Sequence, residues 1–148
     1  MRYYLLPLLV IFTLISCVKP KYSGETVLFE KSSPGTVYVR SGGYGSSKSE
    51  AISNSISNAL TNILIHGIPN SNQELPILGN DALNIFNSNK KYFEKLFSQP
   101  DEFILKKESS DFKFFNTNMP SLETKLLINT SAIRKRLEKD NILRPFGI

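Results

Sequence analysis

The sequence is poor in the residues from which disulfides and metal sites are built. Its 148 residues include one cysteine, one histidine and no tryptophan. A single cysteine excludes a disulfide within the chain, and so few thiol and imidazole groups leave little material for a metal cluster. His66 has no carboxylate or cysteine at ligand spacing, which favours a structural or exposed role. We therefore expect neither a metal nor a cofactor.

Long runs of like charge are also missing. The formal net charge is +5 and the sequence pI is near 9.3. The basic residues are scattered apart from Lys90-Lys91, Lys106-Lys107 and the run Arg134-Lys-Arg136. This pattern predicts a mild preference for anionic surfaces and no nucleic-acid partner. The run is typical of a solvated helix face, with an anionic lipid or nucleic-acid site as the alternative.

The main apolar run lies near the N-terminus. It extends from Tyr3 to Ile15, follows Arg2, and ends in the small residue Ser16 and then Cys17. A basic residue, an apolar region and a small-residue cleavage site in this order are typical of an export signal. The run is shorter than the roughly 20 apolar residues that span a bilayer, so a permanent transmembrane helix is less favoured.

Leu14-Ile-Ser-Cys17 resembles the bacterial lipobox. In proteins with this motif, signal peptidase II cleaves before the cysteine and the thiol receives a diacylglycerol. The resemblance implies acyl chains on Cys17, which hold a protein at a membrane because each buried methylene contributes about 0.8 kcal/mol. Position 18 is valine, whereas lipoproteins retained in the inner membrane of enteric bacteria have aspartate after the cysteine. The acidic cluster that marks surface export of lipoproteins in Bacteroidetes is also missing. We therefore expect the periplasmic face of the outer membrane.

Three regions are predicted along the chain: a lipoprotein signal peptide at 1–16, a flexible tether at 17–34 and a single domain at 35–148. The domain pattern predicts an α+β two-layer sandwich, with a mainly antiparallel sheet of about four strands and two or three helices. The expected strands are 36–40, 103–108, 111–115 and 125–129, and the expected helices are 47–67, 90–98 and 132–139.

A glycine-rich segment, Ser41-Gly-Gly-Tyr-Gly45, separates the first expected strand from the first expected helix. Glycine loops before helices often hold phosphates, but the spacing here does not fit. A P-loop ends in Gly-Lys-Ser/Thr, whereas Ser47 precedes Lys48, and the dinucleotide pattern begun at Gly43 reaches Lys48 in place of its last glycine. The segment therefore predicts a turn, and Ser47 with Glu50 predicts a capping box.

The segment 68–87 is rich in Pro, Asn and Gly, and predicts a long loop with a short helical turn at 81–86. Its apolar residues include Leu75, Ile77 and Leu78. They either pack the loop onto the domain, which we favour, or form a partner-binding surface.

The stretch from Val37 to Gly45, followed by Ser49 to Ala59, is similar to the opening of the LPP20 and flagellar FlgT N-terminal group of envelope proteins. The resemblance implies a strand, a glycine turn and a helix packed in that order, with later strands before a final helix. Proteins of this group are mostly assembly or accessory factors without catalytic residues. The resemblance therefore implies a non-enzymatic function and adds no site residue.

These observations predict a membrane-anchored, non-enzymatic accessory or assembly factor of a cell-envelope complex of the secretion or transport type. We expect a protein partner in the envelope, docked on a sheet edge or on the 68–87 loop. The alternatives are an envelope hydrolase and a small-ligand-binding lipoprotein. The hydrolase is less favoured because the sequence has no Ser-His-Asp arrangement with a supporting motif. A catalytic carboxylate pair, such as Glu102 with Glu123, stays an open alternative.

Overall fold

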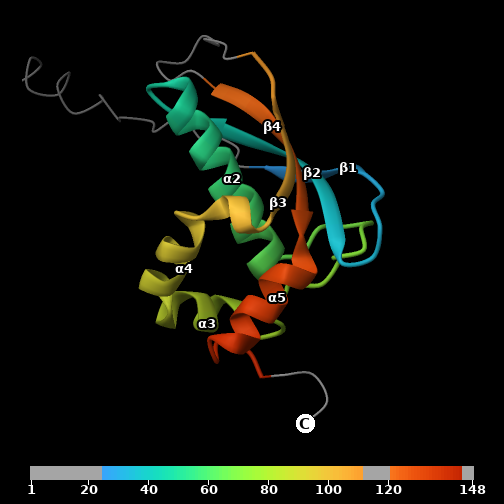
Figure 1. The fold of residues 1–148 in the computed structure, drawn as a ribbon, viewed down its shortest axis with the longest axis vertical. Helices are drawn as coiled ribbons and strands as arrows, with labels where there is room; N and C mark the ends of the chain where they lie inside the picture. Colours follow the sequence, from blue (N-terminus) through green and yellow to red (C-terminus); the bar gives the residue numbers. More distant parts are fainter. Residues whose placement is uncertain (1–24, 112–120, 145–148) are drawn as a thin grey trace, which may run out of the picture.

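The computed structural model describes residues 25–111 and 121–144, which form a four-stranded antiparallel sheet with helices packed on one face (Figure 1). The strand order is β1-β2-β4-β3. The predicted α+β fold is confirmed. The strands are β1 (Thr26–Glu30), β2 (Thr36–Tyr44), β3 (Ile104–Ser109) and β4 (Ser121–Asn129). The helices are α2 (Lys48–Ile65), α3 (Ala82–Ser88), α4 (Lys90–Phe97), the 3-10 turn η2 (Pro100–Glu102) and α5 (Thr130–Lys139).

The core lies between the sheet and α2. Successive side chains of a strand point to opposite faces, so alternate residues of the central strands β2 and β4 are buried. The strands β2 and β4 pair from Thr36 opposite Asn129 to Tyr44 opposite Ser121. The residues of α2 that are buried are Ala51, Ser55, Ile56, Ala59, Leu60, Ile63 and Leu64.

The start of α2 is the one that its sequence predicts. Ser47 is the N-cap, and its hydroxyl accepts a hydrogen bond of 3.2 Å from the backbone N–H of Glu50. The Glu50 carboxylate turns back to Ser46, where it accepts from the backbone N–H at 2.7 Å and from the hydroxyl at 2.6 Å. These hydrogen bonds to Ser46 hold the pKa of Glu50 below its usual value.

The predicted glycine turn is wrong over residues 41–44, because β2 continues to Tyr44. A Cβ atom on Gly43 would lie 2.0 Å from the carbonyl oxygen of Ala51 and 2.6 Å from the backbone nitrogen of Ser55. The helix therefore lies directly against the strand backbone, and only glycine allows this approach. Beside the contact, Ser55 Oγ is hydrogen-bonded to Thr124 Oγ1 at 2.7 Å in a buried position.

Two asparagines of α2 donate hydrogen bonds to backbone carbonyls of β2. Within the described residues, β1 pairs with β2 only over 38–41, so the backbone of β2 beyond Ser41 needs other partners. The Nδ2 group of Asn58 donates to the carbonyl of Gly42 at 2.9 Å, and that of Asn54 donates to the carbonyl of Tyr44 at 2.6 Å. Residues four apart lie on one face of a helix, so α2 presents both amides to the strand.

The structure corrects the boundary of the expected tether. Strand β1 falls inside 17–34, and it pairs with β2 from Thr26 opposite Ser41 to Glu30 opposite Tyr38. Leu28 packs against the core. Residues 26–30 therefore belong to the folded domain, because the short apolar segment of this region buries a side chain by joining the sheet.

The first strand of the hairpin expected from 103–108 and 111–115 corresponds to β3 (Ile104–Ser109). Strand β3 pairs with β4, with Ile104 opposite Ile128 and Ser109 opposite Thr124. Residues 112–115 of the second expected strand lie outside the described residues. The last helix is confirmed, since Asn129 is its N-cap and accepts from the backbone N–H of Ala132 at 2.9 Å.

The contact between α2 and β2 predicts the effect of a single methyl group. Gly43→Ala places its Cβ against helix backbone that cannot move alone, so we expect a loss of about 3 kcal/mol of unfolding free energy. Gly79→Ala is the matched control, because its Cβ meets nothing within 4 Å and only its φ of +75° costs about 1 to 2 kcal/mol. Urea unfolding of both variants measures the difference, and equal losses would contradict the close contact.

Candidate functional site

The structure separates the three apolar residues expected as a partner-binding surface. Leu75 is 76% exposed, whereas Ile77 and Leu78 are 2% and 3% exposed. The backbone N–H of Ile77 donates to the carbonyl of Ile63 at 3.1 Å, and that of Leu78 donates to the carbonyl of Leu64 at 3.1 Å. The loop is packed onto the end of α2, and Ile77 and Leu78 belong to the core. Of the three, only Leu75 is available to a partner.

The other residues singled out from the sequence are dispersed. Cys17 lies outside the described residues. His66 is exposed at the C-cap of α2, and the described part of the chain holds no group of three or more His, Cys, Asp or Glu residues suited to a metal. Glu102 and Glu123 form no carboxylate pair of their own, since Glu102 binds Arg136 and Glu123 lies 3.8 Å from Arg40.

In the stretches 25–111 and 121–144, no helix is both long enough and apolar enough to cross a bilayer.

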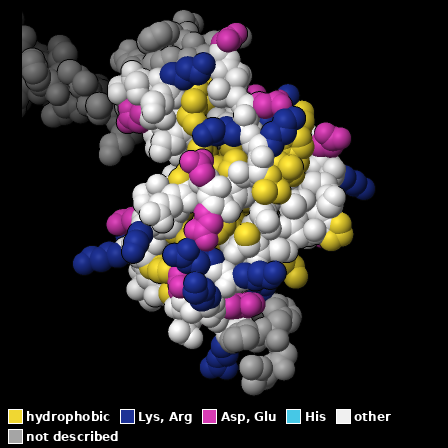
Figure 2. Space-filling view, in the orientation of Figure 1, with side chains coloured by type: hydrophobic (Ala, Val, Ile, Leu, Met, Phe, Trp, Pro, Cys, Tyr) yellow, Lys and Arg dark blue, Asp and Glu magenta, His cyan; other side chains and the backbone are white. Residues whose placement is uncertain are grey.

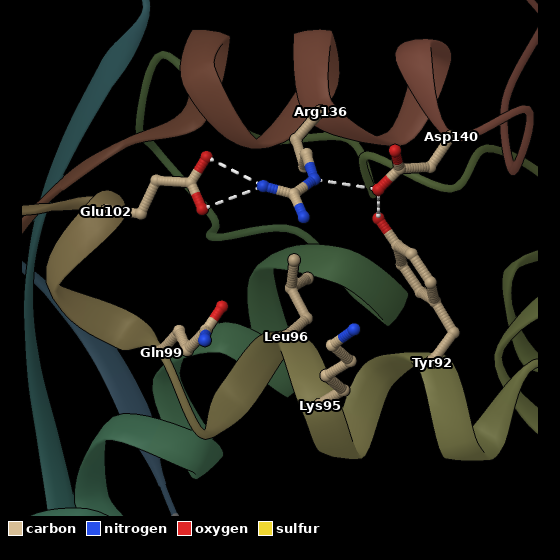
Figure 3. Close-up of a pocket in the computed structure, with 7 residues that line it drawn as sticks. All are labelled: Tyr92, Lys95, Leu96, Gln99, Glu102, Arg136 and Asp140. Carbon is tan, nitrogen blue, oxygen red and sulfur yellow. Dashed lines mark hydrogen bonds and ion pairs between the residues drawn. The ribbon is translucent and has the colours of Figure 1, made fainter.

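A hollow of about 200 Å³ lies between α4 and α5 (Figure 3). Polar side chains from α4, from η2 and from the end of α5 surround it, and Leu96 is its apolar member. The lining residues are Tyr92, Lys95, Leu96, Gln99, Glu102, Arg136 and Asp140.

Arg136 is the centre of the hydrogen-bond network on one side of this hollow. Its Nη1 group donates to both carboxylate oxygens of Glu102, at 3.1 and 3.0 Å, and its Nε group donates to Asp140 Oδ2 at 2.7 Å. The hydroxyl of Tyr92 donates to the same Asp140 oxygen at 2.8 Å. The four side chains thus join α4, η2 and the C-terminal end of α5.

The network shifts the titration of its members away from neutral pH. The hydrogen bonds from Arg136 and then Tyr92 hold the pKa of Asp140 below its usual value. Burial, and next the hydrogen bond to Asp140, raise the pKa of Tyr92 to about 12. Asp140 therefore stays ionised and Tyr92 stays protonated through the physiological range. A general acid or base works best with a pKa near the working pH, so neither shift favours proton transfer.

Three groups at the hollow keep unused hydrogen-bond donors. Within the described residues, Arg136 Nη2, the ammonium of Lys95 and the side-chain amide of Gln99 form no hydrogen bond or ion pair. Figure 3 shows the third guanidinium nitrogen of Arg136 pointing toward the α4 side, where Lys95, Leu96 and Gln99 stand. The hollow can therefore donate hydrogen bonds to an oxygen-rich group.

This cluster was missed from the sequence, where Arg136 was assigned to a solvated helix face. The i,i+4 spacing of Arg136 and Asp140 on one helix is a readable signal for that pair. Nothing local identifies the other two members, because Glu102 lies 34 residues and Tyr92 lies 48 residues from its partner in the chain.

The face of the sheet away from the helices is covered by contacts between its own side chains. The rings of Phe29 and Tyr38 meet edge to face at a centroid distance of 4.9 Å, and Lys125 Nζ lies 4.2 Å from the Phe29 ring centroid. Lys106 Nζ lies 2.7 Å from Glu108 Oε1. The contacts of Phe29 link β1 to β2 and β4, whereas Lys106 and Glu108 pair along β3. Such contacts stabilise a sheet face that has no helix over it.

Both edges of the sheet are poorly suited to adding a strand. The register of β1 shifts between Leu28 and Glu30, and that of β3 shifts between Ile104 and Lys106. Such irregularities, together with the lysines of β3, are the devices by which proteins block edge pairing. The edges therefore do not favour the sheet-edge docking expected from the sequence.

Comparison of the chain with protein-family models, curated proteins and solved structures gives no match. Any functional assignment therefore depends on the residues and geometry described above.

The loop geometry predicts very different losses of stability for substitutions at Leu75 and Ile77. Ile77→Ala removes a buried side chain, so we expect a loss of about 3 kcal/mol of unfolding free energy. Leu75→Ala changes an exposed side chain and should alter stability by less than about 0.5 kcal/mol. Thermal unfolding distinguishes them, and a large loss for Leu75→Ala would show that this residue is part of the packing.

The raised pKa of Tyr92 predicts a late alkaline transition. A group with a raised pKa contributes stability that is complete below its ordinary value of 10.0 and is lost as the pH rises through about 12. Absorbance at 295 nm should show one of the six tyrosines ionising near pH 12, and Tyr92→Phe should remove that component. Asp140→Asn should move it partway toward 10. An unchanged titration in Tyr92→Phe would contradict the assignment.

Proposed function

We propose that the chain is a lipid-anchored, non-enzymatic accessory or assembly factor of a cell-envelope complex of the secretion or transport type. The observation that carries the proposal is Leu14-Ile-Ser-Cys17 at the end of the apolar run from Tyr3 to Ile15. A diacylglycerol on Cys17 together with a further acyl chain gives a stable bilayer anchor. The protein is then held at the periplasmic face of the outer membrane.

The distance between anchor and domain supports a factor that acts close to the membrane. Strand β1 begins at Thr26, and the chain from Cys17 to Thr26 extends at most roughly 30 Å. A short tether confines the domain to a thin layer and raises its effective concentration toward partners in the same membrane.

The chemistry of the charged cluster favours a binding or structural role over hydrolysis. Glu102 and Asp140 both pair with Arg136, whose charge compensates one of the two, and both Glu102 oxygens and Asp140 Oδ2 accept hydrogen bonds. A retaining or inverting glycoside hydrolase instead needs two carboxylates facing the glycosidic bond, and the one that acts as general acid has a raised pKa. The pKa of Asp140 is lowered.

Leu75 is the apolar side chain that we assign to contact with a protein partner in the envelope. It is the most exposed of the large hydrophobic residues in the described chain, at 76%, and it lies on a loop whose neighbours Ile77 and Leu78 fix it to the core. An exposed anchor on a rigid support costs little entropy on binding. A photo-crosslinking residue at position 75 is the means of recovering that partner.

Cys17→Ala tests the anchor. Without the thiol no diacylglycerol can be attached, so metabolic labelling with palmitate should fall to background and the modified mature form should disappear. Ser16→Ala is the matched control, because alanine keeps a small residue before the cysteine and should preserve labelling. Labelling of Cys17→Ala equal to the parent chain, or an unmodified thiol at position 17 of the mature parent, would contradict the lipoprotein assignment.

A further inference from the structure

The basic charge of the described chain is concentrated on α4 and α5. Over α4, η2 and the helix α5 with its C-cap, basic residues outnumber acidic ones, whereas they do not over the rest of the described residues. Figure 2 shows Lys and Arg side chains, with Asp and Glu among them, over this helical end of the molecule. The exposed lysines of the two helices are Lys90, Lys91, Lys95, Lys135 and Lys139.

These lysines are free to meet an external anion. Within the described residues, the four ion pairs involve Arg40, Lys106 and, twice, Arg136, and none involves a lysine of α4 or α5. Arg136 is the partner of both acids that line the hollow, Glu102 and Asp140, and its single charge compensates one of the two. The lysines of α4 and α5 therefore present their charges to solvent outside this trio.

The hollow gives this basic face a specific recess. Arg136 Nη2, Lys95 Nζ and the Gln99 amide provide donors from two helices around a volume of about 200 Å³, with Leu96 among the lining residues. Several converging donors, at least one from an arginine, suit the oxygens of a phosphate group.

We propose that the α4–α5 face rests on an anionic lipid surface, with a headgroup phosphate in the hollow. The proposal rests on the anchoring at Cys17 proposed above. A tether of at most roughly 30 Å is shorter than the roughly 35 Å diameter of a domain of this size, so the anchor keeps the domain in contact range of the bilayer. Lysines near an anionic bilayer then select the α4–α5 face, each strengthening its attachment roughly fivefold.

An anionic lipid fits this face better than a nucleic acid. Binding of single strands depends on exposed aromatic rings that stack on bases. In the described chain, the strongly exposed large hydrophobic residues are Phe29, Leu75, Leu83 and Leu105, and none of them lies on α4 or α5. A dispersed set of lysines with a single phosphate-sized recess matches a surface of many identical headgroups.

Lysine footprinting on vesicles tests the proposal with the full chain. The protein is reconstituted on vesicles of phosphatidylcholine, or of phosphatidylcholine and phosphatidylglycerol at 3:1, and treated with a water-soluble amine acylating reagent. We expect the acylation rates of Lys90, Lys91, Lys95, Lys135 and Lys139 to fall several-fold on the anionic vesicles only, and to recover in 0.5 M NaCl. The rates of Lys48, Lys106 and Lys107 serve as internal controls and should not change.

Two variants, each with four lysines replaced, distinguish an effect of the lysines on the α4–α5 face from an effect of the net charge of the protein. Replacement of Lys91, Lys95, Lys135 and Lys139 by Gln should abolish the protection of Lys90. Replacement of Lys31, Lys48, Lys106 and Lys107 by Gln removes the same charge elsewhere and should preserve it. Equal labelling on both vesicle types, or equal effects of the two variants, would overturn the proposal.

Co-flotation with the same vesicles separates the failure of this inference from the failure of the proposed anchor. Flotation with neutral vesicles but unchanged lysine labelling on anionic ones supports the anchor and overturns the docking face. Flotation with anionic vesicles alone, with protected α4 and α5 lysines, supports the face and overturns the anchor. Flotation with neither overturns both. If 10 mM inorganic phosphate protects Lys95 without vesicles while vesicles do not, a free phosphate site replaces the lipid surface.

Discussion

The structure depends on the direct contact between α2 and the backbone of β2. Because Gly43 has no side chain, the helix approaches until the Ala51 carbonyl oxygen and the Ser55 nitrogen lie 2.0 and 2.6 Å from the position that a Cβ atom would take. At this separation Asn54 and Asn58 reach strand carbonyls, and Ser55 reaches Thr124 on the neighbouring strand. Hydrogen bonds of this kind form only at a fixed spacing. One glycine thus determines how the helix layer and the sheet are joined.

The helical end of the molecule is held together in a different way. Arg136 joins η2 to α5, and Tyr92 joins α4 to the same aspartate, so polar contacts define the relative position of three elements. Partly exposed ion pairs contribute little stability, and the buried rings of this region supply most of it. Phe93 is 1% exposed and stacks with Phe86 at a centroid distance of 4.7 Å. The polar network therefore determines the geometry of a surface whose stability comes from the aromatic contacts beneath it.

Local signals in the sequence predicted the helices well, because caps and apolar spacing act within a few residues. Ser47 and Asn129 are N-caps in the structure, as their positions predict. Three features escaped prediction because they depend on contacts with other elements of the fold. Strand β1 is formed by pairing with β2. Gly43 of β2 is needed because α2 packs against the strand backbone, and Glu102 binds Arg136, which lies 34 residues further along the chain. The residues around these positions have the composition of linkers, turns and solvated surfaces, so the sequence predicted a tether, a turn and a solvated helix face instead. The lipobox stays a prediction from sequence, since Cys17 lies outside the described residues.

Strand β1 also has a mechanical consequence. It is an edge strand, and it is the first described element to receive any force applied to the chain on its N-terminal side. Its register with β2 covers only a few residues, from Thr26 opposite Ser41 to Glu30 opposite Tyr38. A pull in this direction loads those few hydrogen bonds before it reaches the β2–β4 pairing that carries the core. The strand can therefore peel away under load and lengthen the connection while the helices and the central strands keep their packing.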